Sequence, residues 1–136
     1  MPHILIIEDY RDNREVTELI LQDAGYRVTT AINGLRGVQL ATQITPDLIL
    51  MDLGMPVLNG WEATRRLKAS PATSSIPIIA LTAFVSPEEL DSARIAGCMT
   101  VIAKPFEIHN LLEQVAAGVA THGDQQVSQL HRTTEP

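Results

Sequence analysis

Short apolar runs alternate along the chain with longer stretches whose apolar residues recur at a helical period. The first run, His3–Ile7, is apolar and rich in β-branched residues, and it stops at Glu8 and Asp9. Runs of about four to eight apolar residues bounded by turn signals are typical of strands buried on both faces, as in parallel sheets. The same pattern predicts further strands at residues 26–31, 46–52, 77–81 and 100–103.

The stretches between these strands have the apolar spacing of amphipathic helices. In the first of them, Val16, Leu19, Ile20 and Ala24 form a predicted inward-facing stripe that ends at Gly25. Similar patterns predict helices from Leu35 to before Pro46, from Asn59 or Gly60 to Leu67, from Ser86 to Gly97 and from Ile108 to Val119.

Strand and helix alternate five times over the first 120 residues or so. This order predicts an α/β fold, a doubly wound parallel sheet of five strands with five helices on its two faces and right-handed crossovers. The length fits one domain, which we place at residues 1–120. Residues 121–136 are polar and lack a clear period, so we expect a frayed or disordered tail there, or the stub of a linker.

Polar residues end four of the five predicted strands. Glu8 and Asp9 follow the first, Asp52 the third, Thr82 the fourth and Lys104 the fifth. Each one alone has an ordinary explanation as a helix cap or loop residue. In a parallel sheet, however, all carboxyl ends lie at one edge, where open α/β folds bind ligands. We therefore expect these five residues to meet in one site.

The residue types at this edge indicate phosphoryl-transfer chemistry. The repulsion between carboxylates a few Å apart amounts to several kcal/mol, so a cation must offset this repulsion. Oxygen ligands without histidine or cysteine suit Mg²⁺ or Mn²⁺. Lys104 and Thr82 offer an ammonium group and a hydroxyl to phosphoryl oxygens. An aspartate can form an aspartyl-phosphate, and Asp52 is the central candidate.

Composition excludes several other classes of function. The net charge of −6 argues against direct binding to nucleic acid, which requires a basic face. The single cysteine, Cys98, cannot form an internal disulfide. The chain has neither the charged and apolar start of a signal peptide nor a run long enough to span a membrane, so we expect a cytoplasmic protein without membrane contact.

The motifs around these residues closely resemble those of receiver domains of two-component response regulators, most of all the single-domain, CheY-like or DivK-like kind. The resemblance covers about residues 3–117. It rests on five motifs in order, which are Ile6-Ile7-Glu8-Asp9, Met51-Asp52-Leu53-Gly54-Met55-Pro56, Gly60, Ala80-Leu81-Thr82-Ala83 and Ala103-Lys104-Pro105-Phe106.

The resemblance implies the flavodoxin-like strand order 2-1-3-4-5 and a role for each residue of the site. Asp52 would accept the phosphoryl group, and Glu8, Asp9, Asp52 and the carbonyl of Gly54 would hold Mg²⁺. Thr82 would bond a phosphoryl oxygen and swing inward on activation. Ala83 would leave room for the phosphate, and Lys104 would pair with it, followed by a cis bond to Pro105.

The resemblance also implies the partners. The phosphoryl donor would be a phosphohistidine on a sensor histidine kinase or a histidine phosphotransfer protein. The chain would act as a stand-alone switch rather than an enzyme. Its output would pass to a target protein through the fourth helix, fifth strand and fifth helix, a face that also makes weak homodimers in such proteins.

The chain departs from the family pattern in two respects. Val101 stands where the family often has a switching Tyr or Phe, which puts the coupling of Thr82 to the output face in doubt. Gly54 and Phe84 occupy positions that influence how water attacks the acyl phosphate. Because Gly54 has no side chain to position water and Phe84 would shield the site, we expect a long-lived phosphoryl group.

Three other functions compete with this interpretation. A haloacid-dehalogenase-type phosphatase needs a second aspartate where this chain has Gly54. A flavodoxin or nucleotide-binding domain needs a phosphate-binding loop after the first strand, where Glu8 and Asp9 would repel phosphate. The third is a receiver that no longer accepts phosphate and serves only for protein contacts, for which Val101 is the support in the sequence.

Overall fold

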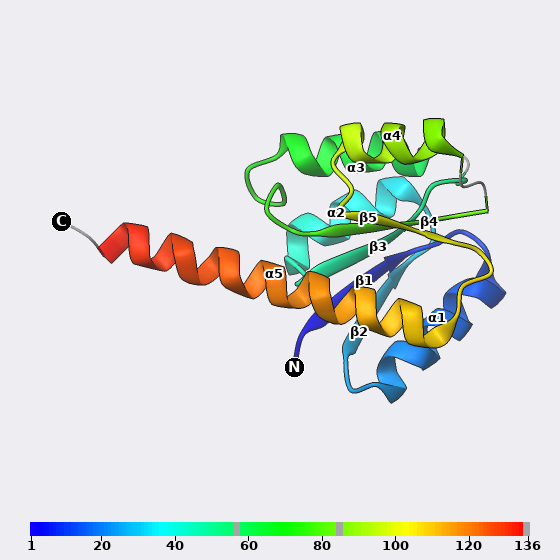
Figure 1. Ribbon diagram of the computed structural model, residues 1–136, viewed down its shortest axis with the longest axis horizontal. Helices are drawn as coiled ribbons and strands as arrows, with labels where there is room; N and C mark the ends of the chain where they lie inside the picture. Colours follow the sequence, from blue (N-terminus) through cyan, green and yellow to red (C-terminus); the bar gives the residue numbers. More distant parts are fainter. Residues whose placement is uncertain (56–57, 84–85, 135–136) are drawn as a thin grey trace.

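Figure 1 shows a central sheet with helices on both faces and one long helix that extends past the sheet. The computed structural model describes residues 1–55, 58–83 and 86–134, with side chains through residue 122. The strands are β1 (His3–Ile7), β2 (Arg27–Ala31), β3 (Leu48–Asp52), β4 (Ile78–Thr82) and β5 (Thr100–Ala103). The helices are α1 (Arg11–Asp23), α2 (Gly34–Ile44), α3 (Gly60–Ala69), α4 (Pro87–Ala96) and α5 (Ile108–Thr134).

All strands are parallel and lie in the order β2-β1-β3-β4-β5. This arrangement confirms both the α/β class and the strand order that the resemblance implied. The central strands β3 and β4 are buried along their whole length, as their uninterrupted apolar runs predicted. The edge strand β2 is only half-buried, in keeping with its mixed composition.

Two apolar layers hold the helices against the sheet. Because successive side chains of a strand point to opposite faces, Leu5 and Ile7 of β1 join the layer under α2, α3 and α4, whereas Ile4 and Ile6 join the layer under α1 and α5. Figure 1 shows these two groups of helices on opposite sides of the sheet. The strand ends are thereby left clear of helices at the carboxyl edge.

The stripe predicted for α1 is wrong at two of its positions. Val16 and Leu19 are 53% and 66% exposed, whereas the buried residues of the helix are Thr17 and Leu21. The apolar residues of this helix occupy more of its circumference than one contact face, so spacing alone did not identify the docked side. Tyr10 precedes the helix without capping it through its side chain. Apolar side chains consequently remain on the outer surface of α1.

The last helix continues well past the boundary expected from the sequence. In place of an irregular segment after Thr121, α5 runs to Thr134, and Figure 1 shows it projecting beyond the sheet. Extending an anchored helix is far easier than nucleating a new one, and no proline lies between Pro105 and Pro136. The anchor is His122, which is buried with Nδ1 3.5 Å from Oδ1 of Asp47.

The other helices begin largely where the sequence places their caps. Asn33, Asn59 and Ser86 each accept a hydrogen bond from a backbone N–H in the first turn of α2, α3 and α4. Helix α4 ends at Ala96 and is capped by Gly97, whose φ of 115° lies in the left-handed region. Among the described helices, none is both long and apolar enough to cross a lipid bilayer.

Gly60, the first residue of α3, allows this helix to approach the end of β3. A Cβ atom at this position would lie 2.4 Å from the carbonyl oxygen of Asp52 and 2.6 Å from Cα of Leu53. Both neighbours are backbone atoms and cannot turn aside. The absence of a side chain at Gly60 is therefore a condition for the local position of Asp52.

We predict that Gly60→Ala lowers the free energy of unfolding by about 1–3 kcal/mol, because backbone must shift to admit the methyl group. Gly54→Ala is the matched control, since its Cβ would meet Oδ1 of Asp52 at an ordinary 3.9 Å. The control should change the free energy of unfolding by less than about 1 kcal/mol. Urea denaturation measures both, and equal losses would contradict the close approach of α3 to β3.

Candidate functional site

The carboxyl edge of the sheet brings together residues from four strands. Glu8 follows directly after β1, and the register pairs Asp52 with Leu81 and Thr82 with Ala103. The backbone N–H of Glu8 donates to the carbonyl of Ala31 at 3.1 Å, which continues the pairing of β1 with β2 past the strand end. The predicted site therefore lies at one edge, on backbone that the sheet holds in place.

Asp52 lies at the centre of this edge and is only 8% exposed. Its Oδ1 accepts a hydrogen bond from the backbone N–H of Gly54 at 3.1 Å. The N–H of Leu53 donates to the carbonyl of Leu81 at 3.1 Å, so the chain remains tied to β4 immediately after the carboxylate. These bonds orient the carboxylate toward the edge.

Lys104 joins the acidic residues from the other side. Its Nζ lies 3.1 Å from Oε1 of Glu8 and 3.4 Å from Oδ1 of Asp52. Its backbone N–H donates to the carbonyl of Thr82 at 2.8 Å, which fixes the chain just after β5. The bond between Lys104 and Pro105 is cis, as the resemblance implied. One ammonium group thus contacts two carboxylates that are far apart in the sequence.

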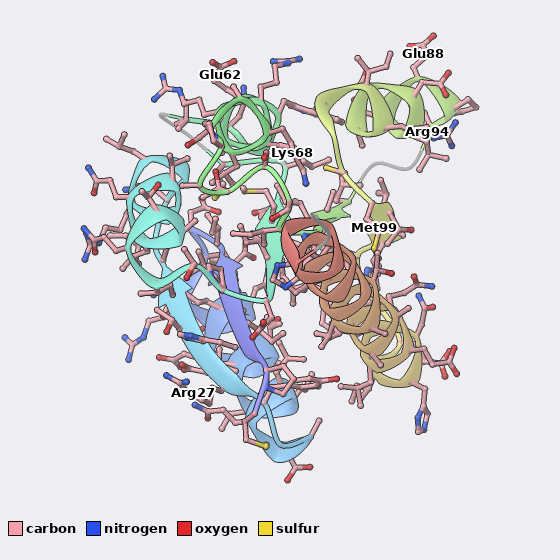
Figure 2. The ribbon with its side chains drawn as sticks, turned by 90° about the vertical axis from the view of Figure 1, so that its left-hand side faces the viewer. Arg27, Glu62, Lys68, Glu88, Arg94 and Met99 are labelled. Carbon is pink, nitrogen blue, oxygen red and sulfur yellow. The ribbon has the colours of Figure 1, made fainter. Side chains whose placement is uncertain are left out.

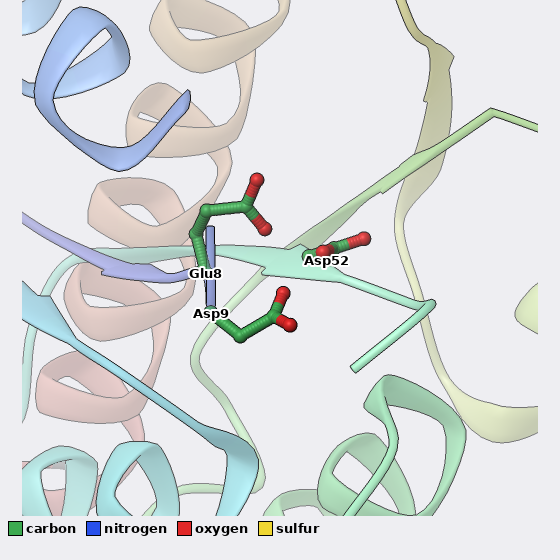
Figure 3. Close-up of side chains that lie close together, drawn as sticks. All are labelled: Glu8, Asp9 and Asp52. Carbon is green, nitrogen blue, oxygen red and sulfur yellow. The ribbon is translucent and has the colours of Figure 1, made fainter. Parts of the chain in front are cut away.

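The three carboxylates form a cluster that fits a divalent cation. Glu8, Asp9 and Asp52 each offer one oxygen, and these oxygens lie within 4.8 Å of one another; Figure 3 shows the three side chains converging. Glu8 is buried and Asp9 exposed. As a carboxylate, Glu8 has a buried oxygen, Oε2, without a hydrogen-bond donor in the described part of the chain. An all-oxygen donor set with one unsatisfied atom suits Mg²⁺ or Mn²⁺.

The pKa values of the two buried acids, Glu8 and Asp52, are shifted in opposite directions. Burial, reinforced by the neighbouring carboxylate of Asp52, raises the pKa of Glu8 to about 7, although Lys104 acts against this. Burial alone would also raise the pKa of Asp52. The hydrogen bonds from Glu8 and Gly54 and the charge of Lys104 outweigh burial, and they hold the pKa of Asp52 below its usual range. Asp52 is therefore ionised at neutral pH, whereas Glu8 is partly protonated there.

The remaining predicted residues lie around this core. Thr82 is buried at the end of β4, and Ala83 follows it at the surface. Gly54 lies against Asp52 through its amide, while the metal-binding role of its carbonyl stays a prediction. Phe84 and Pro56, to which the sequence also gave roles, lie outside the described residues.

Sequence patterns did not reveal the part played by Arg14. Its Nη1 donates to the backbone carbonyls of Glu8 and Asp9, at 3.0 Å and 3.4 Å. A basic residue in the first turn of the helix after an acidic pair was the available signal, but nothing in the sequence specified a backbone partner for it.

An apolar groove next to the acidic cluster was also not foreseen. The cavity has a volume of about 520 Å³ and lies between α1 and the chain that enters α5. Val16, Ile20 and Ile108 line its apolar part, and Glu8 and Lys104 lie at the end toward the site. The exposed side of α1 thus continues directly into the charged edge.

Comparison with known proteins identifies relatives across nearly the whole domain. A family model described as response regulator receiver domain matches residues 4–116. The polar-differentiation response regulator DivK of Brucella anthropi is 34% identical over 112 residues, which are 82% of this chain and 91% of DivK. The transcriptional regulator RpaA of Synechocystis sp. is 35% identical over 117 residues, which are 86% of this chain. The chain spans about half of RpaA, at 48% of its length.

Solved structures agree with these matches. The chemotaxis protein CheY4 of Vibrio cholerae superimposes with a TM-score of 0.83 at 30% identity, over 87% of this chain and 98% of CheY4. The receiver domain of the sensor histidine kinase PA1611 from Pseudomonas aeruginosa gives a TM-score of 0.82 at 36% identity, over 88% and 98% of the two chains. In that receiver domain a magnesium ion is coordinated in the active site cleft.

The raised pKa of Glu8 predicts how stability depends on pH when EDTA removes divalent cations. Because the folded-state value of about 7 exceeds the ordinary 4.5, the folded protein binds this proton more tightly than the unfolded chain does. This stabilisation is complete below pH 4.5 and is lost as pH rises through about 7. The shift of Asp52 has the opposite sign and acts as pH falls through 3.8 and below, outside this window.

Urea denaturation between about pH 5 and about pH 8 is therefore expected to show a steady loss of stability in the wild type. Glu8→Gln, which cannot ionise, should flatten this profile. If stability fell equally with pH in the wild type and in Glu8→Gln, protonation of Glu8 would not be the cause of the pH dependence.

Proposed function

Because the chain belongs to the response regulator receiver domain family, we propose that it is a signalling switch that accepts a phosphoryl group on Asp52. The observation that carries the proposal is the position of Lys104, 3.1 Å from Glu8 and 3.4 Å from Asp52, beside a cluster of three carboxylates. A nucleophile, a fixed cation and ligands for a metal are the parts that phosphoryl transfer to a carboxylate requires.

Asp52 is the proposed nucleophile. Its lowered pKa keeps the carboxylate charged, so that an oxygen can attack the phosphorus of a phosphohistidine. The new oxygen–phosphorus bond forms as the phosphorus–nitrogen bond breaks, and the imidazole nitrogen takes the electron pair. Lys104 then pairs with a phosphoryl oxygen, and the hydroxyl of Thr82 donates to another.

Glu8, Asp9, Asp52 and the carbonyl of Gly54 are the proposed ligands of Mg²⁺, for which Mn²⁺ can substitute. When bound, the ion offsets the negative charge that the phosphoryl group brings to an acidic site. The clustered oxygens and the unsatisfied Oε2 of Glu8 support this assignment, as does the magnesium ion in the related PA1611 receiver domain.

The phosphoryl donor is proposed to be a sensor histidine kinase or a histidine phosphotransfer protein that docks on α1. A protein that presents a histidine to Asp52 must cover the carboxyl edge of the sheet. The groove beside this edge has exposed apolar side chains at Val16 and Ile108, which are 53% and 50% exposed. Exposed apolar surface next to a charged site is typical of a protein-binding face.

Output is proposed to pass to a target protein through α4, β5 and the first part of α5, a face that also suits a weak homodimer. Figure 2 shows Glu88 and Arg94 at the surface of α4. Ile95 on this helix is 85% exposed. Val101 stands where a switching aromatic ring would couple Thr82 to this surface, so the surface is expected to respond only weakly to Thr82. Gly54 favours a long-lived phosphoryl group. Because the net charge is −6, the proposal does not include direct binding to nucleic acid.

We place the receiver unit at residues 1–120, with residues 121–134 as an extension of its last helix. This boundary remains a prediction, although the family model ends nearby at residue 116.

Incubation with acetyl phosphate and Mg²⁺ is expected to add one phosphoryl group to the wild type and none to Asp52→Asn. The reason is that this substitution removes the attacking oxygen charge while preserving the shape of the side chain. Intact-mass measurement follows the reaction, and excess EDTA should abolish it. A wild type that gains no mass would favour the alternative of a receiver that serves only for protein contacts.

Val16→Glu is expected to slow phosphoryl transfer from a phosphorylated histidine kinase by about tenfold or more, since a buried unpaired charge at an interface costs several kcal/mol. The same variant should react with acetyl phosphate at the wild-type rate. Ile95→Glu, on the opposite side of the sheet, is the matched control and should retain both reactions. Equal slowing of transfer from the kinase in the two variants would refute docking at α1.

A further inference from the structure

Arg14 contacts the backbone of the acidic pair rather than its carboxylates. One guanidinium nitrogen, Nη1, donates to the carbonyl of Glu8 at 3.0 Å and to that of Asp9 at 3.4 Å. Both carbonyls lie between the end of β1 and the start of α1, after the last strand pairing. The side chain of Arg14 is half-buried; its bond to Glu8 is partly shielded from water, whereas its bond to Asp9 is exposed.

Helix stability does not account for an arginine at this position. The N-terminal turn of a helix carries a partial positive charge, so a cation there is unfavourable. The neighbouring Arg11 lies on the same turn but turns away to Glu15, 2.9 Å distant on the exposed side of the helix. The two hydrogen bonds of Arg14 are the contacts that compensate for its location.

The direction of a carboxylate depends on the peptide groups on either side of it. Holding two successive carbonyls with one donor restricts the backbone torsions of Glu8 and Asp9 together, and this fixes where both side chains leave the chain. Glu8 and Asp9 are two of the three members of the oxygen cluster beside Asp52. Arg14 therefore influences the relative position of the two carboxylates through their backbone carbonyls.

We infer that Arg14 is a positioning residue that preorganises Glu8 and Asp9 for a divalent cation; this rests on the metal site of the proposed function. Groups that orient metal ligands from outside the coordination sphere commonly change metal affinity by about 10- to 100-fold when removed. Arg14 acts through hydrogen-bond geometry, so a lysine, which keeps the charge but lacks the planar fork, replaces it only in part.

The test compares the full chain with Arg14→Met, Arg14→Lys and Arg11→Met in thermal unfolding over a series of MgCl₂ concentrations, starting from EDTA. The rise in stability with Mg²⁺ gives the dissociation constant, independently of phosphorylation. We expect Arg14→Met to weaken Mg²⁺ binding about tenfold and Arg14→Lys by less. Arg11→Met removes a guanidinium from the same helix turn and should bind Mg²⁺ as the wild type does.

The two possible failures give different results. If Arg14→Met melts earlier in EDTA but gains as much stability from Mg²⁺ as the wild type, Arg14 is only a structural residue and the inference is overturned. If the wild type itself gains nothing from Mg²⁺, the metal site of the proposed function fails and this inference fails with it. Should Arg14→Met not fold, unchanged Mg²⁺ affinity in Arg14→Lys overturns the inference equally.

Discussion

The ammonium group of Lys104 lies between the carboxylates of Glu8 and Asp52, 3.1 Å from one and 3.4 Å from the other. Two acids in partly buried surroundings cannot both ionise readily without a cation beside them. Glu8 follows β1, Asp52 ends β3 and Lys104 follows β5, and the parallel sheet in this order brings those ends together at one edge. The buried runs of β3 and β4, the close approach at Gly60 and the bonds after each strand all maintain this arrangement.

This charge balance also explains how the site can be selective. One ammonium group does not neutralise three carboxylates, so the edge by itself repels phosphate. A divalent cation reverses that preference, which makes phosphoryl acceptance conditional on the metal under the proposed function. The acid nearest to Lys104, Glu8, is held partly protonated with a pKa of about 7, whereas Asp52 stays charged. The two buried carboxylates therefore have different chemistry although they share one cation.

Much of the fold and most of the site follow from local sequence signals. Uninterrupted apolar runs indicate strands buried on both faces, and residues at strand ends must meet in a parallel sheet, so the sequence alone is enough to place Asp52 and Lys104 together. Features that depend on shape could not be predicted in this way. Val16 on α1 is apolar but exposed, because helical spacing does not specify which of two apolar sides docks. The backbone contacts of Arg14 depend on the path of the loop, which no residue pattern specifies.

The length of α5 has a mechanical consequence. The helix begins four residues after Lys104 and is about 40 Å long at about 1.5 Å per residue. His122 contacts Asp47, which directly precedes β3, and this contact holds the helix near the amino ends of the strands. Ile108 and Thr134 lie at similar distances from His122 along the helix, so a small tilt beside the reactive edge would move the distal end by a similar distance in the opposite direction. The geometry of α5 thus links the chain beside Lys104 to a surface beyond the sheet through one continuous helix, without amplifying a tilt.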